Sequence, residues 1–472
     1  MQCNTLIEIC VRVCICVNEA RGLTKDTAVL MKGLEDARLA QGEGEDLLTM
    51  DELMLRAGEA MLMARVKASP TNMHQRQKYT NNASGIRVDD EHASAHDFMC
   101  KLREKSGSGA CASQAALDIL RDQCVAAGMR FRELRATDAC NIAQECLAGQ
   151  GKPVLLSRAA LGDAWKRGLS IDSLRRRFGD DVVSVNDRAP ARHADAEAGE
   201  AQTSFKVRMK TYVDYMAARR NMEAMRDPHY ARSGGHHRPF YLNGWSLFSR
   251  CPELLTEFEA PACVAAADDT EALLAEIGGL VGGKARDETN AWASISANMQ
   301  KIFIGCRGCV TRLHYDSGDA HGWLAQASGA KLFILFAPED SQFLVPPRAE
   351  VLRTSRTMMT TGQERACANN EKEKRAASAS PGVAVKDDTQ AFVDPLRPPS
   401  SAATHTGHTY AKATMFAAVV QEGELIVIPR RWWHYALALE DDNLTLQRNF
   451  YNAATNAAGL VKMTLDAIRK RR

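Results

Sequence analysis

The sequence predicts a mainly β protein, a barrel or jelly roll with flanking helices, preceded by an α-helical extension. Short strand-like runs separated by turns begin near residue 150 and are densest in two blocks, residues 301–337 and 413–451. A polar segment without apolar periodicity, at about 348–390, separates the two blocks. Many short strands divided by one long connection favour a barrel or jelly roll over a parallel α/β sheet.

Composition limits the classes of protein and partner. The chain has 472 residues, more than one domain usually contains, and its 60 Lys and Arg residues almost balance its 58 Asp and Glu residues. We therefore do not expect direct nucleic-acid binding. The 14 cysteines are too few for a disulfide scaffold and indicate a reducing, intracellular location. An apolar run at 7–17 is too short to span a membrane; we expect a buried strand or helix, with a degenerate targeting segment as the alternative.

We expect residues 1–125 to form a helical and partly disordered extension with little site content. Good helix formers with repeated apolar spacing predict two helices within 28–67, separated by a Gly-Glu-Gly turn. The polar, aperiodic residues from 69 to about 108 are typical of a linker or a disordered segment. A further helix is predicted from Ala112 to about Met129.

The next domain is expected over residues 126–460, with the segment at about 348–390 as a disordered surface insertion. Its first half contains strand-like runs and a strand that continues into a helix, at 153–156, 182–185, 238–242 and 206–216. Residues 461–472 are expected to be a basic helix end. The tail Arg469-Lys470-Arg471-Arg472 is either a nuclear address or a frayed end that complements the helix dipole.

One metal-type motif lies in the strand blocks: His314-Tyr315-Asp316 in the first, with His434 in the second. Residues i and i+2 of a strand share a face, so an imidazole and a carboxylate there can bind one ion. Two histidines and one carboxylate leave three coordination positions open, an arrangement suited to Fe(II). A second pair of the same type, His193 and Asp195, lies in an Ala- and Glu-rich segment without strand character and is interpreted as a loop.

The surroundings of the motif are consistent with a functional interior. Lys331 opens an apolar strand, where its ammonium needs either an anionic partner or an exit to water. The residues that share a strand face with His434 are small, Ala436 and Ala438, which leaves space in front of the imidazole. The last strand presents a row of polar side chains that could line the same interior: Thr445, Gln447 and Asn449.

Three segments together resemble the JmjC family of Fe(II)- and 2-oxoglutarate-dependent oxygenases: FIGCRGCVTRLHYD, GWLAQASGAKLFILFAPED and GELIVIPRRWWHYALALEDDNLTLQRNFYN. The resemblance extends upstream through GKPVLLSR and RPFYLNGWSLF and covers roughly residues 130–455. Within the family, the chain is most similar to the JmjC lysyl hydroxylases also described as arginine demethylases. The resemblance implies a double-stranded β-helix, the jelly-roll fold of cupins.

The resemblance also implies roles for particular residues. It assigns the iron ligands to His314, Asp316 and His434. Four further side chains are expected around 2-oxoglutarate, the first three at its distal carboxylate and the last near the iron: Thr311, Lys331, Tyr241 and Asn449. A buried cation with hydroxyl donors is a suitable partner for a carboxylate. The chain departs from the similar hydroxylases at Leu324, where they have an asparagine, so we expect weaker binding of 2-oxoglutarate or compensation by His321.

Two other pairs of residues are interpreted as structural rather than functional. Cys306 and Cys309 form a single CxxC motif, which without a second pair indicates two ordinary thiols rather than a zinc site. Trp432 and Trp433 are expected to pack in the core rather than to form a stacking platform.

The function implied by the resemblance is that of a 2-oxoglutarate-dependent dioxygenase with Fe(II), 2-oxoglutarate and O₂. We expect hydroxylation of a protein side chain, with lysine favoured, because no zinc-finger array of the kind that accompanies many histone demethylases is visible in the sequence. The alternatives are a histone lysine or arginine demethylase, and a JmjC-fold binding scaffold without turnover. The expected partner is a protein substrate, with the nucleus favoured over the cytoplasm, no membrane association, and an oligomer left open.

Overall fold

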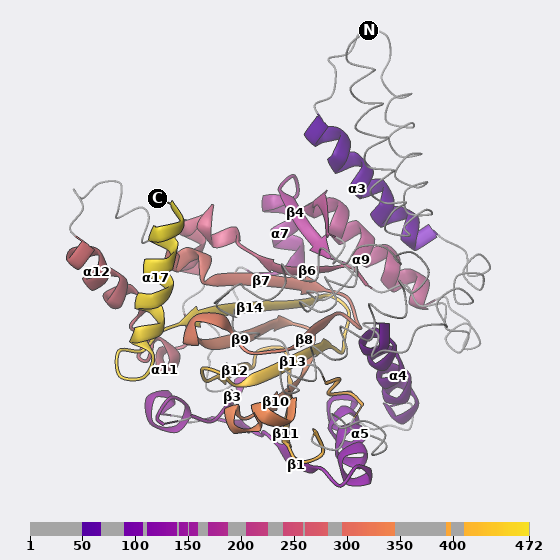
Figure 1. The fold of residues 1–472 in the computed structure, drawn as a ribbon. Helices are drawn as coiled ribbons and strands as arrows, with labels where there is room; N and C mark the ends of the chain where they lie inside the picture. Colours follow the sequence, from indigo (N-terminus) through magenta and orange to yellow (C-terminus); the bar gives the residue numbers. More distant parts are fainter. Residues whose placement is uncertain are drawn as a thin grey trace, which may run out of the picture.

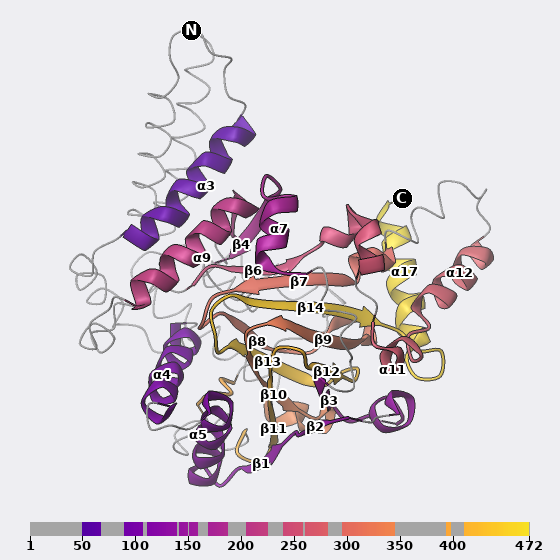
Figure 2. The same cartoon turned by 180° about the vertical axis from the view of Figure 1, so that it is seen from behind.

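Two β-sheets form the centre of the computed structural model, and helices cover their outer faces (Figures 1 and 2). The structure describes residues 50–67, 89–106, 111–138, 141–149, 151–158, 169–186, 204–224, 239–257, 260–281, 295–344, 393–397 and 410–471. The apolar run at 7–17, the first of the two helices predicted within 28–67, and the insertion at 348–390 lie outside these residues.

The smaller sheet has the strand order β1-β11-β10-β13-β8. Its strands are β1 (Arg130–Glu133), β11 (Thr414–Val420), β10 (Lys331–Phe336), β13 (Trp433–Ala438) and β8 (Val310–His314). The larger sheet has the order β2-β3-β12-β9-β14-β7-β6-β4-β5. Its strands are β2 (Ala136–Thr137), β3 (Val154–Leu156), β12 (Leu425–Ile428), β9 (His321–Ser328), β14 (Asn443–Phe450), β7 (Gln300–Gly305), β6 (Tyr241–Trp245), β4 (Val182–Asn186) and β5 (Ser204–Arg208).

The strands from β7 to β14 pair in a nested, antiparallel pattern. The first pairs with the last, β7 with β14, and then β8 with β13, β9 with β12 and β10 with β11. Successive pairs alternate between the two sheets, which is the connectivity of a jelly roll. The predicted mainly β jelly roll is therefore confirmed. Nesting also places the end of β8 beside the start of β13, although about 120 residues of chain separate them.

Side chains of the two sheets alternate between an interior and two outer faces. On β10, Phe333 and Leu335 pack against residues of the opposite sheet, such as Ile426, and therefore lie between the sheets. Leu332 and Ile334 belong to the separate core outside the smaller sheet. Lys331 shares the inner face of β10 by the same alternation, so its side chain enters the interior.

The outer core of the smaller sheet is closed by α4 (Asp89–Ser106) and α5 (Ala112–Ala126). Over the larger sheet lie α7 (Ile171–Phe178) and α9 (Met209–Ala224), and α3 (Met50–Lys67) packs on α9 and β5. At one end of the two sheets lie α11 (Ala262–Ala265), α12 (Thr270–Val281) and α17 (Ala457–Arg471), while α14 (Ser341–Leu344) follows β10. None of the described helices has the length and apolar character needed to cross a membrane.

The prediction of a linker over 69–108 is wrong for residues 89–106, which form α4. The segment is mostly polar, but Ala95, Phe98 and Leu102 recur at helical spacing and are buried in the core that α4 shares with α5 and the smaller sheet. This stripe is only one residue wide on each turn. Average polarity over the segment therefore concealed a helix that tertiary packing stabilises.

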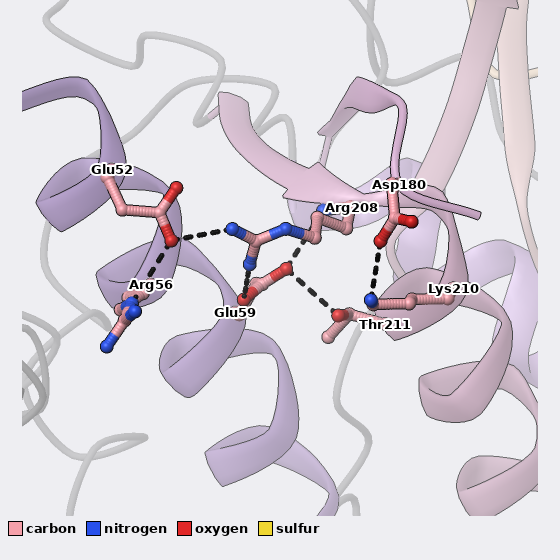
Figure 3. A network of polar contacts seen from close by, with 7 residues as sticks. All are labelled: Glu52, Arg56, Glu59, Asp180, Arg208, Lys210 and Thr211. Carbon is pink, nitrogen blue, oxygen red and sulfur yellow. Dashed lines mark hydrogen bonds and ion pairs between the residues drawn. The ribbon is translucent and has the colours of Figure 1, made fainter. Parts of the chain in front are cut away.

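Arg208, at the end of β5, is bound by two glutamates of α3 (Figure 3). Its Nη1 lies 2.9 Å from Glu59 Oε2, and its Nη2 lies 2.6 Å from Glu52 Oε1. Glu59 Oε1 also accepts hydrogen bonds from the backbone N–H of Arg208 and from the hydroxyl of Thr211, at 3.1 and 2.9 Å. Because α9 begins at Met209, Glu59 acts as a cap for α9 supplied by another helix.

Replacement of Arg208 by alanine is expected to lower the free energy of unfolding by about 2 kcal/mol, because it removes the cation that Glu59 binds and leaves Glu52 with the exposed Arg56 alone. The midpoint of urea unfolding measures the change. The control is Lys210→Ala, which removes an exposed ion pair with Asp180 and should leave the free energy of unfolding nearly unchanged. Equal losses in the two variants would contradict a specific role for Arg208.

Candidate metal centre

His314 and His434 face each other across the pairing of β8 with β13. They are register partners, and the centroids of their rings lie 4.2 Å apart. Asp316 was expected two residues further along the same strand, but β8 ends at His314. Asp316 instead lies in extended backbone immediately before the turn Ser317–Asp319. The extended backbone still brings its carboxylate back toward the two imidazoles.

Hydrogen bonds fix the orientation of both imidazole rings. His314 Nδ1 lies 2.7 Å from the carbonyl oxygen of Arg312, and His434 Nδ1 lies 3.1 Å from that of Trp432. A carbonyl can only accept, so both Nδ1 atoms carry a proton, and each Nε2 atom has a free lone pair when its ring is neutral. The two Nε2 atoms lie 3.6 and 3.8 Å from Asp316 Oδ1.

These three side chains can therefore hold one metal ion. Their ligand atoms all lie within 4.8 Å of one another. Among the described residues, no other set of three His, Cys, Asp or Glu side chains lies this close together. Metal–nitrogen and metal–oxygen bonds of about 2.0–2.2 Å place adjacent ligands about 3 Å apart, so a small inward movement would complete the site. Carbonyl acceptors behind both rings are typical support for histidine ligands.

The protonation of the three groups suits cation binding. Burial and the neighbouring His314 lower the pKa of His434 to about 4, so its ring is neutral near pH 7. Burial alone would raise the pKa of Asp316, but the contact with His314 and the positive charge of the imidazoles in their protonated form lower it; Asp316 in turn raises the pKa of His314. A neutral imidazole beside a carboxylate is the form that binds a divalent metal.

A cluster of three residues deeper in the interior has the chemistry of a carboxylate site. Lys331 is 3% exposed, and its Nζ donates a hydrogen bond to Tyr241 Oη over 3.0 Å. The side chains of Tyr241 and Thr311 share a further hydrogen bond. The ammonium also lies 5.5 Å from the ring centroids of Tyr241 and Phe303.

Lys331 is a buried cation without an anionic partner among the residues that the structure describes. Its ammonium does not reach water, and no carboxylate of the described residues lies within ion-pair distance of it. Burial lowers the pKa of Lys331 to about 7. Of the two alternatives drawn from the sequence, exit to water is therefore wrong, and an anionic partner remains to be supplied.

A β-bulge brings Thr311 to the interior. Residues three apart in a regular strand face opposite sides, yet Thr311 and His314 both point inward while Val310 and Leu313 join the outer core. The pairing explains this, because two residues of β8, Arg312 and Leu313, oppose the single residue of β13 that lies between His434 and Ala436. The extra residue reverses the alternation and aims both side chains at one interior.

Asn449 lies beside Asp316, next to Gly322 of β9. An added Cβ at Gly322 would lie 3.3 Å from Asp316 Oδ2 and 3.4 Å from Asn449 Oδ1. Gln447 Nε2 donates to Asn449 Oδ1 over 2.8 Å and so orients the amide. Gly322 was not singled out from the sequence, because a glycine in a strand carries no chemical signal until the strand is placed against a site.

Gly322→Ala and Gly322→Val should progressively weaken metal binding, because the new side chain crowds the carboxylate of Asp316. The valine variant is expected to bind Mn(II) about tenfold less tightly, measured by titration followed by electron paramagnetic resonance. Circular dichroism should report little change in secondary structure, since valine is favourable in a strand. Wild-type affinity in the valine variant would contradict the crowding.

The expectation that His321 compensates for Leu324 is wrong. His321 lies on the outer face of β9, where its Nδ1 accepts from the backbone N–H of Arg430 at 3.0 Å and its Nε2 lies 2.9 Å from Thr455 Oγ1. Leu324 lies on the inner face, in register with Gln447, and packs at the edge of the interior apolar cluster. Weaker binding of 2-oxoglutarate because of Leu324 stays a prediction.

The remaining candidates lie apart from this centre. Cys306 and Cys309 are buried and belong to different clusters, the outer core and the interior around Tyr241. Trp432 and Trp433 are both buried in packing clusters, as predicted. The pair of His193 and Asp195 lies outside the described residues.

Comparison with known proteins identifies a family for the chain but no individual relative. A family model described as a cupin-like domain matches residues 141–456 of the chain, which span the strands from β3 to β14 and all the site residues predicted from the sequence. No curated protein matches the chain.

Proposed function

The chain belongs to the cupin-like domain family, and from that premise we propose that it is a JmjC-type dioxygenase, dependent on Fe(II) and 2-oxoglutarate, that hydroxylates a protein side chain. The proposal rests mainly on one observation: a metal-type triad and a buried lysine share the interior of the same barrel. His314, Asp316 and His434 converge at its open end, and the unpaired ammonium of Lys331 lies deeper in the same barrel. Together they match the two ends of a metal-bound dicarboxylate.

The donor set fits iron. Two imidazole nitrogens and one carboxylate oxygen form the facial arrangement used by non-haem Fe(II) oxygenases, and three protein ligands leave positions for a cosubstrate and O₂. When bound, the iron with 2-oxoglutarate and O₂ supplies an oxidant that can insert oxygen into a C–H bond, with succinate and CO₂ as the other products.

The chain's own residues bind, orient and exclude water. Lys331 would pair with the distal carboxylate of 2-oxoglutarate, and Tyr241 and Thr311 would add hydroxyl contacts. Phe303, Cys309 and Ala438 pack around Tyr241 and keep this end of the interior dry. At the other end Asn449, whose Oδ1 accepts a hydrogen bond from Gln447, lies beside Asp316.

A lysyl side chain is proposed as the target, supported by the similarity of the chain to the JmjC lysyl hydroxylases at residues 207–216, in the 17-residue step from His314 to Lys331, and at residues 430–439. The substrate is proposed to be a protein, encountered in the nucleus. Leu324 supports a second candidate, a JmjC-fold scaffold without turnover, because an apolar side chain stands where the similar hydroxylases have an amide.

Incubation with Fe(II), 2-oxoglutarate and lysine-containing peptides tests the proposal by mass spectrometry. Hydroxylation adds one oxygen atom to a peptide, whereas demethylation of a methylated lysine or arginine removes one CH₂ unit. The control is omission of 2-oxoglutarate. If no succinate forms at saturating iron, the chain is a scaffold and the enzyme proposal fails.

A further inference from the structure

Lys301 lies on the inner face of β7, close to the candidate metal centre. Its neighbours Ile302 and Ile304 belong to the outer core of the larger sheet, whereas Phe303 packs in the interior against Tyr241. Side chains of a strand alternate between its two faces, so Lys301 shares the interior face with Phe303.

The register of β7 with β14 places Lys301 near the metal ligands. Lys301 is opposite Gln447, and the backbone N–H of Asn449 donates to the carbonyl of Met299 over 3.0 Å. Lys301 and Asn449 are therefore diagonal neighbours, with Cα atoms about 7–8 Å apart. Asn449 lies beside Asp316 across Gly322, so Lys301 belongs to the row of interior side chains that leads to the metal centre. Its side chain reaches Ser246, directly after β6, and would turn toward β14 to meet a ligand at that centre.

The ammonium of Lys301 has no anionic partner in the described part of the chain. Its Nζ donates to the hydroxyl of Ser246, and no ion pair to a described carboxylate involves it. Burial lowers the pKa of Lys301, so the cation is partly desolvated without compensation. On the outer face of the same strand pair, by contrast, Arg448 is bound to Asp268 at 2.7 Å.

Lys301 is partly accessible to solvent, whereas Lys331 is not. Lys331 is enclosed at the deep end, which the proposed function assigns to the cosubstrate. Lys301 is half-buried, and the side chains of His314 and Asp316 nearby are 26% and 17% exposed. A ligand entering from solvent at the metal centre would therefore meet Lys301 first.

We propose that Lys301 binds a carboxylate of the primary substrate, so that the protein segment presented to the metal centre carries an acidic residue next to its target. This inference rests on the proposed function and narrows it to acidic sequence contexts. The geometry suits this role because Lys301, Gln447 and Asn449 form a polar row on one face, with the cation as its charged member.

Two matched peptides test the inference with the full chain loaded with Mn(II) and 2-oxoglutarate, which prevents turnover. One is an acetylated, amidated pentapeptide with a central lysine between glutamates, and its twin has glutamines in place of the glutamates. The acidic peptide is expected to bind about tenfold more tightly, measured by calorimetry. Lys301→Met should abolish the difference, and Lys301→Arg should retain most of it. The control Lys206→Met, at an exposed site on β5, should keep the tenfold ratio.

Equal affinity for the two peptides in the wild type, or no measurable binding of the acidic one, would overturn the inference. It would also fail if Lys301→Met kept the tenfold ratio but weakened binding of 2-oxoglutarate, because the carboxylate would then be that of the cosubstrate. Failure of the proposed function is separate, since it appears as absence of 2-oxoglutarate binding and of succinate formation in the wild type.

Discussion

Replacement of His434 by alanine is expected to abolish metal-dependent conversion of 2-oxoglutarate to succinate and to weaken Mn(II) binding by at least about 100-fold. Loss of a group that only supports a ligand commonly costs 10- to 100-fold in metal affinity, so loss of a ligand should cost more. His434 is 6% exposed, its Nδ1 is fixed by the carbonyl of Trp432, and among the described residues no fourth His, Cys, Asp or Glu joins the group to take its place. Metal titration and succinate assays on the same preparation measure both effects.

The matched control is His96→Ala. His96 lies on α4, which packs on the outer side of the smaller sheet, and it contacts Cys100 and Asp97, whereas the two histidines of β8 and β13 face the interior. This variant should keep wild-type metal affinity and turnover. If His434→Ala retains its metal affinity, then the three-residue centre is not where the metal binds, and the proposed function loses its basis.

The convergence of the metal centre could be predicted only in part from the sequence. His314 and Asp316 are close along the chain, but the distant His434 joins them because nested pairing places β13 beside β8. The resemblance supplied that connection, whereas strand alternation alone could not. The expected i, i+2 arrangement on one strand was wrong in detail, since Asp316 lies beyond the end of β8.

Other features depend on tertiary structure that no local pattern encodes. The inward orientation of Thr311 requires a bulge, and the importance of Gly322 appears only when β9 is placed beside Asp316. His321 was misassigned because one step along a strand reverses the face of a side chain. The helix α4 was missed because three small or isolated apolar residues among polar neighbours resemble a linker until they are packed.

The carboxylate site should make binding of 2-oxoglutarate depend on pH, with affinity falling as the pH rises above about 7. Burial lowers the pKa of Lys331 to about 7 in the free protein, and a bound carboxylate favours the charged form and raises that pKa. Between the two values binding takes up a proton, so the dissociation constant should rise toward tenfold per pH unit. Both carboxylates of 2-oxoglutarate are ionised throughout this range, and His434, with a pKa of about 4, is already neutral.

Calorimetry at pH 8 in two buffers of different ionisation enthalpy measures the proton uptake directly, with Mn(II) saturating. Lys331→Met should weaken binding by about 100-fold or more, because the distal carboxylate is then buried without a cation. The same variant should bind with no proton uptake, which a general loss of structure would not produce. If Lys331→Met keeps the wild-type pH dependence, then the titrating group is another residue, and Lys331 has only a structural role. Because Tyr241 and Thr311 remain in that variant, the residual affinity measures what the hydroxyl groups contribute alone.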